Sequence, residues 1–147
     1  MKGLIITILL FLGTQVLVKA QSSVLTTYYG IKNSLVNADA NGAAGKAAEF
    51  IKSADSLQAD PVKDKLIEDA KLISSSTDIV KQRETFSRLS QNLYLLLKEK
   101  KLSGTPVYQV YCPMKKKYWL SNEKNIQNPY YGKVMLTCGS ITDTINP

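Results

Sequence analysis

Residues 77–101, TDIVKQRETFSRLSQNLYLLLKEKK, decide the fold because they carry the longest helical pattern in the chain. Most of their apolar side chains recur three or four positions apart, which places them on one face of a helix. These side chains are Ile79, Val80, Phe86, Leu89, Leu93, Leu96 and Leu97. Thr77 or Ser76 offers a hydroxyl to cap the first turn. The basic residues of 98–101 suit the negative end of the helix dipole.

Three further helices are expected upstream, over about 22–38, 43–57 and 61–74. Each stretch repeats apolar residues at helical spacing. Asp60-Pro61 starts the third, since it combines an acidic N-cap with a proline at the first helical position. Four amphipathic helices with short connections predict a mainly α fold, an antiparallel up-and-down four-helix bundle.

The composition changes at residue 105, where helical periodicity ends. Residues 107–111 alternate and are rich in β-prone side chains, so they predict a short strand. The rest of the tail, 105–147, is expected to be irregular with short β structure and to pack on the bundle. If strand 107–111 pairs with a strand near 133–138, the motifs at their ends meet.

The N-terminus indicates export. Residues 1–20 have a positive charge at Lys2, a short apolar run and small residues before the expected cleavage point, as a cleavable signal peptide does. The apolar run is shorter than the roughly 20 residues that span a bilayer. We therefore expect a periplasmic or secreted protein, with 21–147 as one domain and no stable membrane span after cleavage.

The net charge of the mature chain does not indicate a particular class of partner. Removal of Lys2 and Lys19 lowers the Lys+Arg count from 19 to 17, against 12 acidic residues. The basic residues are mostly dispersed among acids, which is typical of a solvated surface rather than of a nucleic-acid interface. No nucleic-acid partner is expected.

The chain contains no histidine. It therefore lacks the commonest general base and the usual serine or cysteine triads. The acidic residues are scattered over helix surfaces, and no pair stands out as catalytic. We expect that the protein is not an enzyme.

Sulfur is the chemistry that remains, and it lies in the tail. Cys112 and Met114 flank a proline, and Met135 and Cys138 are three residues apart, so each pair can converge on one point. Two thiolates and two thioethers would form a soft site suited to copper(I) or silver(I). The lysines at 115–117 could favour thiolate by lowering the cysteine pKa values.

Each of these residues also has a structural interpretation. Two cysteines in an exported domain often form a disulfide, and closing this loop would contribute about 3 kcal/mol. The two methionines could fill gaps in the core. The aromatic residues of the tail could anchor it to the bundle or contact a partner; these are Trp119, Tyr130 and Tyr131.

The tail resembles a family known as a domain of unknown function, numbered three-three-four-seven in that series, which is widespread in Bacteroidetes-type exported proteins. The resemblance covers essentially the whole mature chain. It rests on Tyr111-Cys112-Pro113-Met114, Trp119-Leu120-Ser121, Glu123, Ile126, Asn128-Pro129-Tyr130-Tyr131-Gly132, Met135-Leu136-Thr137-Cys138-Gly139 and Thr144-Ile145. The segment between Met114 and Trp119 is shorter and richer in lysine than the family pattern.

That family's domain also occurs attached to periplasmic adaptor subunits of copper and silver efflux pumps. The resemblance therefore implies metal handling, with an efflux adaptor or another envelope protein as a possible partner. Two hypotheses follow. One is a copper(I) binder with Cys112, Met114, Met135 and Cys138 as ligands. The other is a non-catalytic interaction module stapled by a Cys112–Cys138 disulfide.

Overall fold

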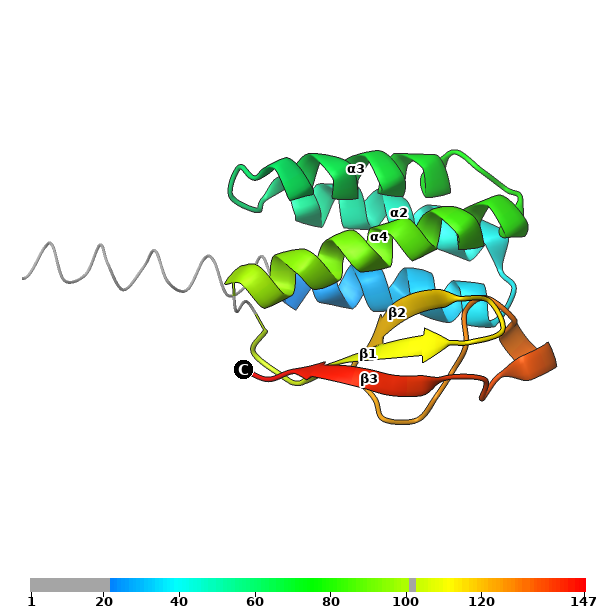
Figure 1. The fold of residues 1–147 in the computed structure, drawn as a ribbon. Coiled ribbons are helices and arrows are strands. Elements are labelled where there is room, and N and C mark those ends of the chain that lie inside the picture. The colour runs from blue at the N-terminus through cyan, green and yellow to red at the C-terminus, as the bar shows by residue number, and fades with distance from the viewer. Residues whose placement is uncertain (1–21, 101–102) are drawn as a thin grey trace, which may run out of the picture.

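The computed structural model describes residues 22–100 and 103–147, and the expected signal peptide, residues 1–20, lies outside them. Residues 22–36 are helical, and three more helices follow. They are α2 (Ala40–Asp55), α3 (Pro61–Ser74) and α4 (Ile79–Lys100). Successive helices pack on one another, so the expected four-helix arrangement is confirmed (Figure 1). In the described part of the chain, no helix is both long and apolar enough to cross a membrane.

Aspartates cap the helices. Asp39 accepts a hydrogen bond from the backbone N–H of Gly42, and Asp60 accepts one from Val62. Asp78 caps α4 by accepting from the N–H groups of Val80 and Lys81. The expected Thr77 or Ser76 cap is therefore wrong. A carboxylate one residue later satisfies the same orphan donors and places negative charge at the positive end of the dipole.

A buried glutamine joins three helices at one end of the bundle. The Gln82 amide nitrogen donates to the backbone carbonyls of Ala40, Ile73 and Ser76, at 2.9, 3.2 and 2.6 Å. These carbonyls belong to the start of α2, the last turn of α3 and the connection that leads to α4. Gln82 is fully buried, so this one side chain links α4 to backbone groups of α2, α3 and the connection between α3 and α4.

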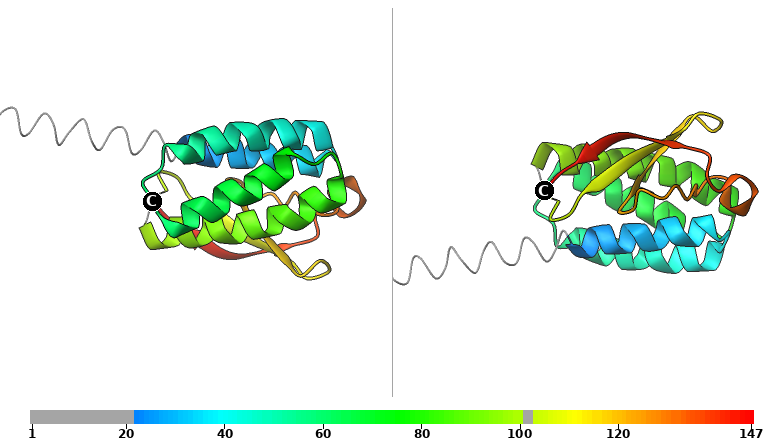
Figure 2. Two further views of the ribbon diagram at one scale, coloured as in Figure 1. Left: turned by 90° about the horizontal axis from the view of Figure 1, so that it is seen from above. Right: turned by 90° about the horizontal axis from the view of Figure 1, so that it is seen from below.

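The tail forms a three-stranded antiparallel sheet in the order β2-β1-β3. Its strands are β1 (Val107–Cys112), β2 (Lys117–Ser121) and β3 (Ser140–Ile145). The sheet lies against α4 and the 22–36 helix, on the side away from α2 and α3 (Figures 1 and 2). The expected short β structure packed on the bundle is thus present and more regular than the sequence indicated.

The pairing of residues 107–111 with a strand near 133–138 is wrong. Residues Gly132–Met135 form a short 3-10 helix, and β1 pairs instead with β2 and β3. Gly132 explains the difference, because its φ of 58° turns the chain out of the extended conformation. A Cβ at Gly132 would stand 2.7 Å from the backbone oxygen of Val36, so this turn lies directly against the end of the first helix.

Candidate functional site

The two cysteine sulfurs lie in contact. Cys112 ends β1 and is fully buried, whereas Cys138 lies in the loop before β3 and is half-buried. Their Sγ atoms are 3.3 Å apart, and both are free thiols. The sequence prediction that these two residues meet is therefore correct, although the strand pairing that suggested it is not.

Asn128 holds the loop that carries Cys138. Its amide nitrogen donates to the Cys138 carbonyl at 2.6 Å, and its amide oxygen accepts from the N–H groups of Tyr130 and Tyr131. Its backbone N–H also donates to the carbonyl of Leu136 at 2.8 Å. Because Asn128 is fully buried, these bonds are shielded from water and fix the path of the chain beside Cys112.

A close contact fixes Cys138 from the other side. A Cβ at the following residue, Gly139, would lie 2.7 Å from the ring of Trp119 and 3.2 Å from Val110. The backbone after Cys138 therefore packs against the indole with no room for a side chain. The Cys138 sulfur is positioned by this contact and by Asn128 together.

The surroundings shift the pKa values of the two thiols in opposite directions. Burial raises the pKa of Cys112, but the backbone N–H of Lys115, the Cys138 thiol and the Asn128 amide outweigh it, so the net pKa is lowered. The pKa of Cys138 is raised, first by its hydrogen bond to Cys112 and then by burial and repulsion. Of the two thiols, Cys112 therefore loses its proton at the lower pH.

The methionines lie at the surface. Met114 is in the turn after β1 and is 63 % exposed, and Met135 ends the 3-10 helix and is 37 % exposed. The Met135 carbonyl accepts a hydrogen bond from the Cys138 N–H at 3.1 Å, so its backbone adjoins the cysteine pair. Neither methionine fills a gap in the core. In the described residues, no three histidine, cysteine or carboxylate side chains cluster as metal ligands.

Two of the three aromatic residues considered for partner contact are buried. Trp119 is fully buried and Tyr130 is 3 % exposed, and their rings meet edge to face at 5.9 Å. Tyr130 also packs on Phe86 of α4, so both rings anchor the sheet to the bundle. Of the two interpretations given for these residues, anchoring to the bundle therefore fits Trp119 and Tyr130, and contact with a partner does not. Tyr131 is half-buried, with the Lys115 ammonium 4.7 Å from its ring centre.

The sequence-based predictions missed two buried polar groups: Asn128, beside the cysteine pair, and Lys32, on the 22–36 helix. Asn128 entered the prediction only as part of the stretch that resembles the family, and nothing in a single sequence distinguishes a buried asparagine from an exposed one. Lys32 lies within a helical pattern that suggests an exposed charge, yet it is only 3 % exposed. The available signal for the burial of Lys32 was its position directly after Ile31, which belongs to the apolar stripe of this helix.

Comparison with known proteins identifies a family. The family model described as "Protein of unknown function (DUF3347)" matches residues 24–105, more than half of the chain. No curated protein and no solved structure gave a significant match. The match covers the helices and ends before β1, so both cysteines lie beyond the matched residues. The chain belongs to this family of unknown function.

Proposed function

We propose, taking the chain as a member of this family, that it is an exported, non-catalytic binder of copper(I) or silver(I). Cys112 and Cys138 would be the thiolate ligands, and Met114 and Met135 the thioether ligands. The observation that carries the proposal is the 3.3 Å contact between two free cysteine sulfurs. Soft thiolate and thioether donors favour monovalent copper over calcium or magnesium.

The thiol environment suits this chemistry. A thiolate, not a thiol, binds metal, and the pKa of Cys112 is already lowered by its hydrogen-bond donors. Metal–thiolate bonds of about 2.3 Å in tetrahedral geometry place two sulfurs about 3.8 Å apart. The pair would therefore need to open by about half an ångström on binding. Cys138, the more accessible sulfur, would meet the ion first and release its proton.

The methionines would complete the coordination from the surface. Their exposure leaves both thioethers free to turn toward the cysteines, and Met135 is three residues from Cys138. A surface site also suits transfer of the ion to a partner. A heavy-metal efflux adaptor or another envelope protein is the partner that the family resemblance suggests.

A disulfide-stapled interaction module is the second candidate, and the same distance favours it. Sulfurs 3.3 Å apart need only a small approach to reach the bond length of about 2.05 Å. The staple would close a loop of 26 residues and contribute about 3 kcal/mol to stability. An oxidised pair offers no thiolate, so the two functions exclude each other in one molecule.

A thiol count on protein exported to the periplasm, followed by copper(I) titration against a chromophoric chelator, separates the candidates. Metal binding predicts two reactive thiols that disappear with one equivalent of copper(I). Cys112→Ser and Cys138→Ser should each abolish tight binding. Met114→Leu and Met135→Leu should weaken binding less, because thioethers are weaker ligands. Full oxidation with no copper uptake would favour the disulfide module.

A further inference from the structure

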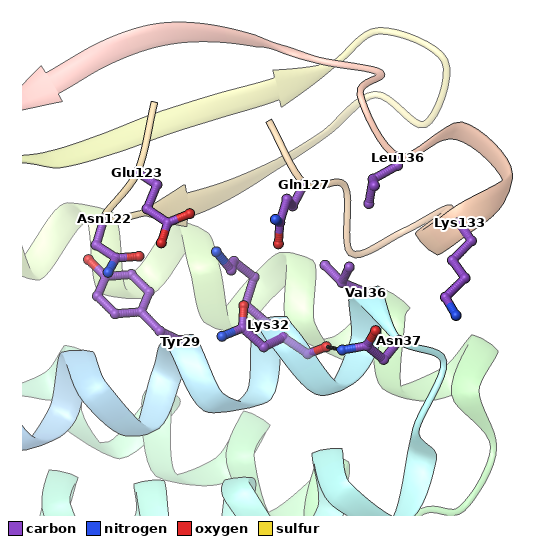
Figure 3. Close-up of a pocket in the computed structure, with 10 residues that line it drawn as sticks. Tyr29, Lys32, Val36, Asn37, Asn122, Glu123, Gln127, Lys133 and Leu136 are labelled. Carbon is purple, nitrogen blue, oxygen red and sulfur yellow. Dashed lines mark hydrogen bonds between the residues drawn. The ribbon is translucent and has the colours of Figure 1, made fainter. Parts of the chain in front are cut away.

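A polar cleft lies between the 22–36 helix and the 122–136 segment, and neither cysteine lines it. It has a volume of about 440 Å³ and is bounded by the 22–36 helix and by that segment. Figure 3 shows its lining, in which Lys32 and Val36 come from the helix, Asn37 from the turn after it, and Glu123, Gln127 and Leu136 from the segment above. This volume falls within the range of small-molecule sites in proteins.

Lys32 is the unusual group in this cleft. It is only 3 % exposed, and its side chain rises from the helix toward the Glu123 and Gln127 side of the cleft (Figure 3). Among residues 22–100 and 103–147, no hydrogen bond or ion pair reaches its ammonium group. Burial lowers the pKa of Lys32, and the Glu123 carboxylate only partly offsets this effect. The Lys32 side chain is thus almost wholly enclosed while its ammonium has no hydrogen-bond acceptor among the described residues, and an acceptor in the cleft would supply one.

A second polar group in the wall lacks a partner. The Tyr29 hydroxyl is buried without a hydrogen bond, and the Lys32 ammonium lies 5.9 Å from the Tyr29 ring centre. Burial raises the pKa of Tyr29, so the phenol keeps its proton and remains a donor. The amides that line the rest of the cleft offer both donors and acceptors; they are Asn33, Asn37, Asn122 and Gln127.

The charges around the cleft select a monovalent anion. Lys32 and Lys133 contribute positive charge and Glu123 contributes one negative charge, so the lining carries one net positive charge. Glu123 would repel the second charge of a phosphate dianion. A carboxylate matches the net charge and offers the Lys32 ammonium an acceptor.

We propose that this cleft binds a small polar carboxylate, with Lys32 as the anion-binding residue and the surrounding amides holding its hydroxyl or amide groups. The site is separate from the cysteine pair and requires no metal. The ligand carboxylate gives the Lys32 ammonium the acceptor that the described residues do not provide.

Amide chemical-shift titrations test the proposal with four organic probes and inorganic phosphate. D-gluconate, L-lactate and L-glutamate carry a carboxylate with further polar groups, and D-sorbitol matches gluconate in chain length without the charge. We expect saturable shifts for at least one carboxylate, confined to the lining of the cleft, with a Kd below about 10 mM. Sorbitol should cause no saturable shift. Absence of saturation with all three carboxylates would overturn the proposal, as would inorganic phosphate binding equally well.

Lys32→Met separates a binding role from a structural one. This variant keeps the length of the side chain and removes the buried charge, so it should weaken carboxylate binding at least tenfold and raise the Tm. Lys52→Met, on the exposed surface of α2, should change neither. A lower Tm with unchanged carboxylate affinity would show that Lys32 is structural. If Lys32→Met fails to fold, Lys32→Gln serves for the same comparison.

Discussion

The helical region, residues 22–100, and the C-terminal region, residues 103–147, are stabilised in different ways. The helices share an apolar core in which Phe50, Leu66 and Leu93 are fully buried. The C-terminal region also contributes apolar side chains, but its loops depend on single polar groups such as Asn128. The family match covers the first region, and the thiol chemistry lies in the second. The helices thus form the scaffold, and the hydrogen bonds of Asn128 hold the loop that carries Cys138.

The strongest test of this difference is Asn128→Ala. The change leaves the Cys138 carbonyl and the N–H groups of Tyr130 and Tyr131 without partners in a buried setting. At about 1–3 kcal/mol for each unsatisfied group, partly relieved by water entry, we expect a loss of about 3 kcal/mol. Urea unfolding measures the stability, and a thiol reagent should react faster with the loosened Cys138.

A matched control keeps this test specific. Asn125→Ala, in the same loop but on the surface, should change stability by less than about 0.5 kcal/mol. Equal losses for the two variants would mean that the loop is not held by the Asn128 hydrogen bonds. The division of the molecule into an apolar scaffold and a polar loop would then be wrong.

Tyr28→Phe tests the junction between the regions. The Tyr28 hydroxyl accepts from the backbone N–H of Leu120 at 2.9 Å and lies 2.7 Å from the Ser90 hydroxyl, so it links β2 to α4 and the first helix. Phenylalanine preserves the stacking on Phe86 but leaves the Leu120 N–H unsatisfied. We expect a loss of about 2 kcal/mol in urea unfolding.

The control for this variant is Tyr111→Phe, because the Tyr111 ring pairs with Tyr118 at a partly exposed position. Its stability should remain within about 0.5 kcal/mol of the parent. Equal losses of stability in the two variants would mean that the buried Tyr28 hydroxyl contributes no more than the partly exposed one of Tyr111.

The sequence predicted the scaffold better than the site, for a physical reason. Helix signals are local, so Asp60-Pro61 and the apolar spacing place α3 over Pro61–Ser74, the range expected for it. Strand pairing is not local, and the turn at Gly132 redirects residues that look β-prone. The contact between Cys112 and Cys138 was foreseen, but the exposure of Met114 was not, because it depends on the hairpin between β1 and β2.

An acid titration tests how β3 is attached to α4. The Asp143 carboxylate accepts from the Tyr94 hydroxyl at 2.6 Å and from the Lys98 ammonium at 2.7 Å. The bond from Lys98 contributes most to lowering the pKa of Asp143, to about 2. A lowered carboxyl pKa gives stability that is present above the unfolded value of about 3.9 and is lost as the pH falls toward 2.

Asp143→Asn should therefore flatten the fall in stability between about pH 4 and pH 2, while changing stability near pH 7 by a smaller amount than Tyr28→Phe. Denaturant unfolding at several pH values measures this slope. Asp55→Asn, on the exposed end of α2, should leave the slope unchanged. A parental acid slope in Asp143→Asn would mean that this contact contributes little to the attachment of β3.

The smallest effect is expected from an ion pair at the surface, where β2 meets α4. Lys117 of β2 pairs with Glu84 of α4 at 2.5 Å, but the Glu84 side chain is 61 % exposed. Water and salt screen such a pair, so Glu84→Gln should reduce stability by less than about 1 kcal/mol, and 1 M salt should remove the difference. A larger loss that 1 M salt removes would show that surface charge, and not buried hydrogen bonding, attaches the sheet to the helices. Tyr28 and Glu84 both contribute to the attachment of β2 to the helices. Comparing the two losses of stability therefore shows whether buried hydrogen bonding or surface charge contributes more to that attachment.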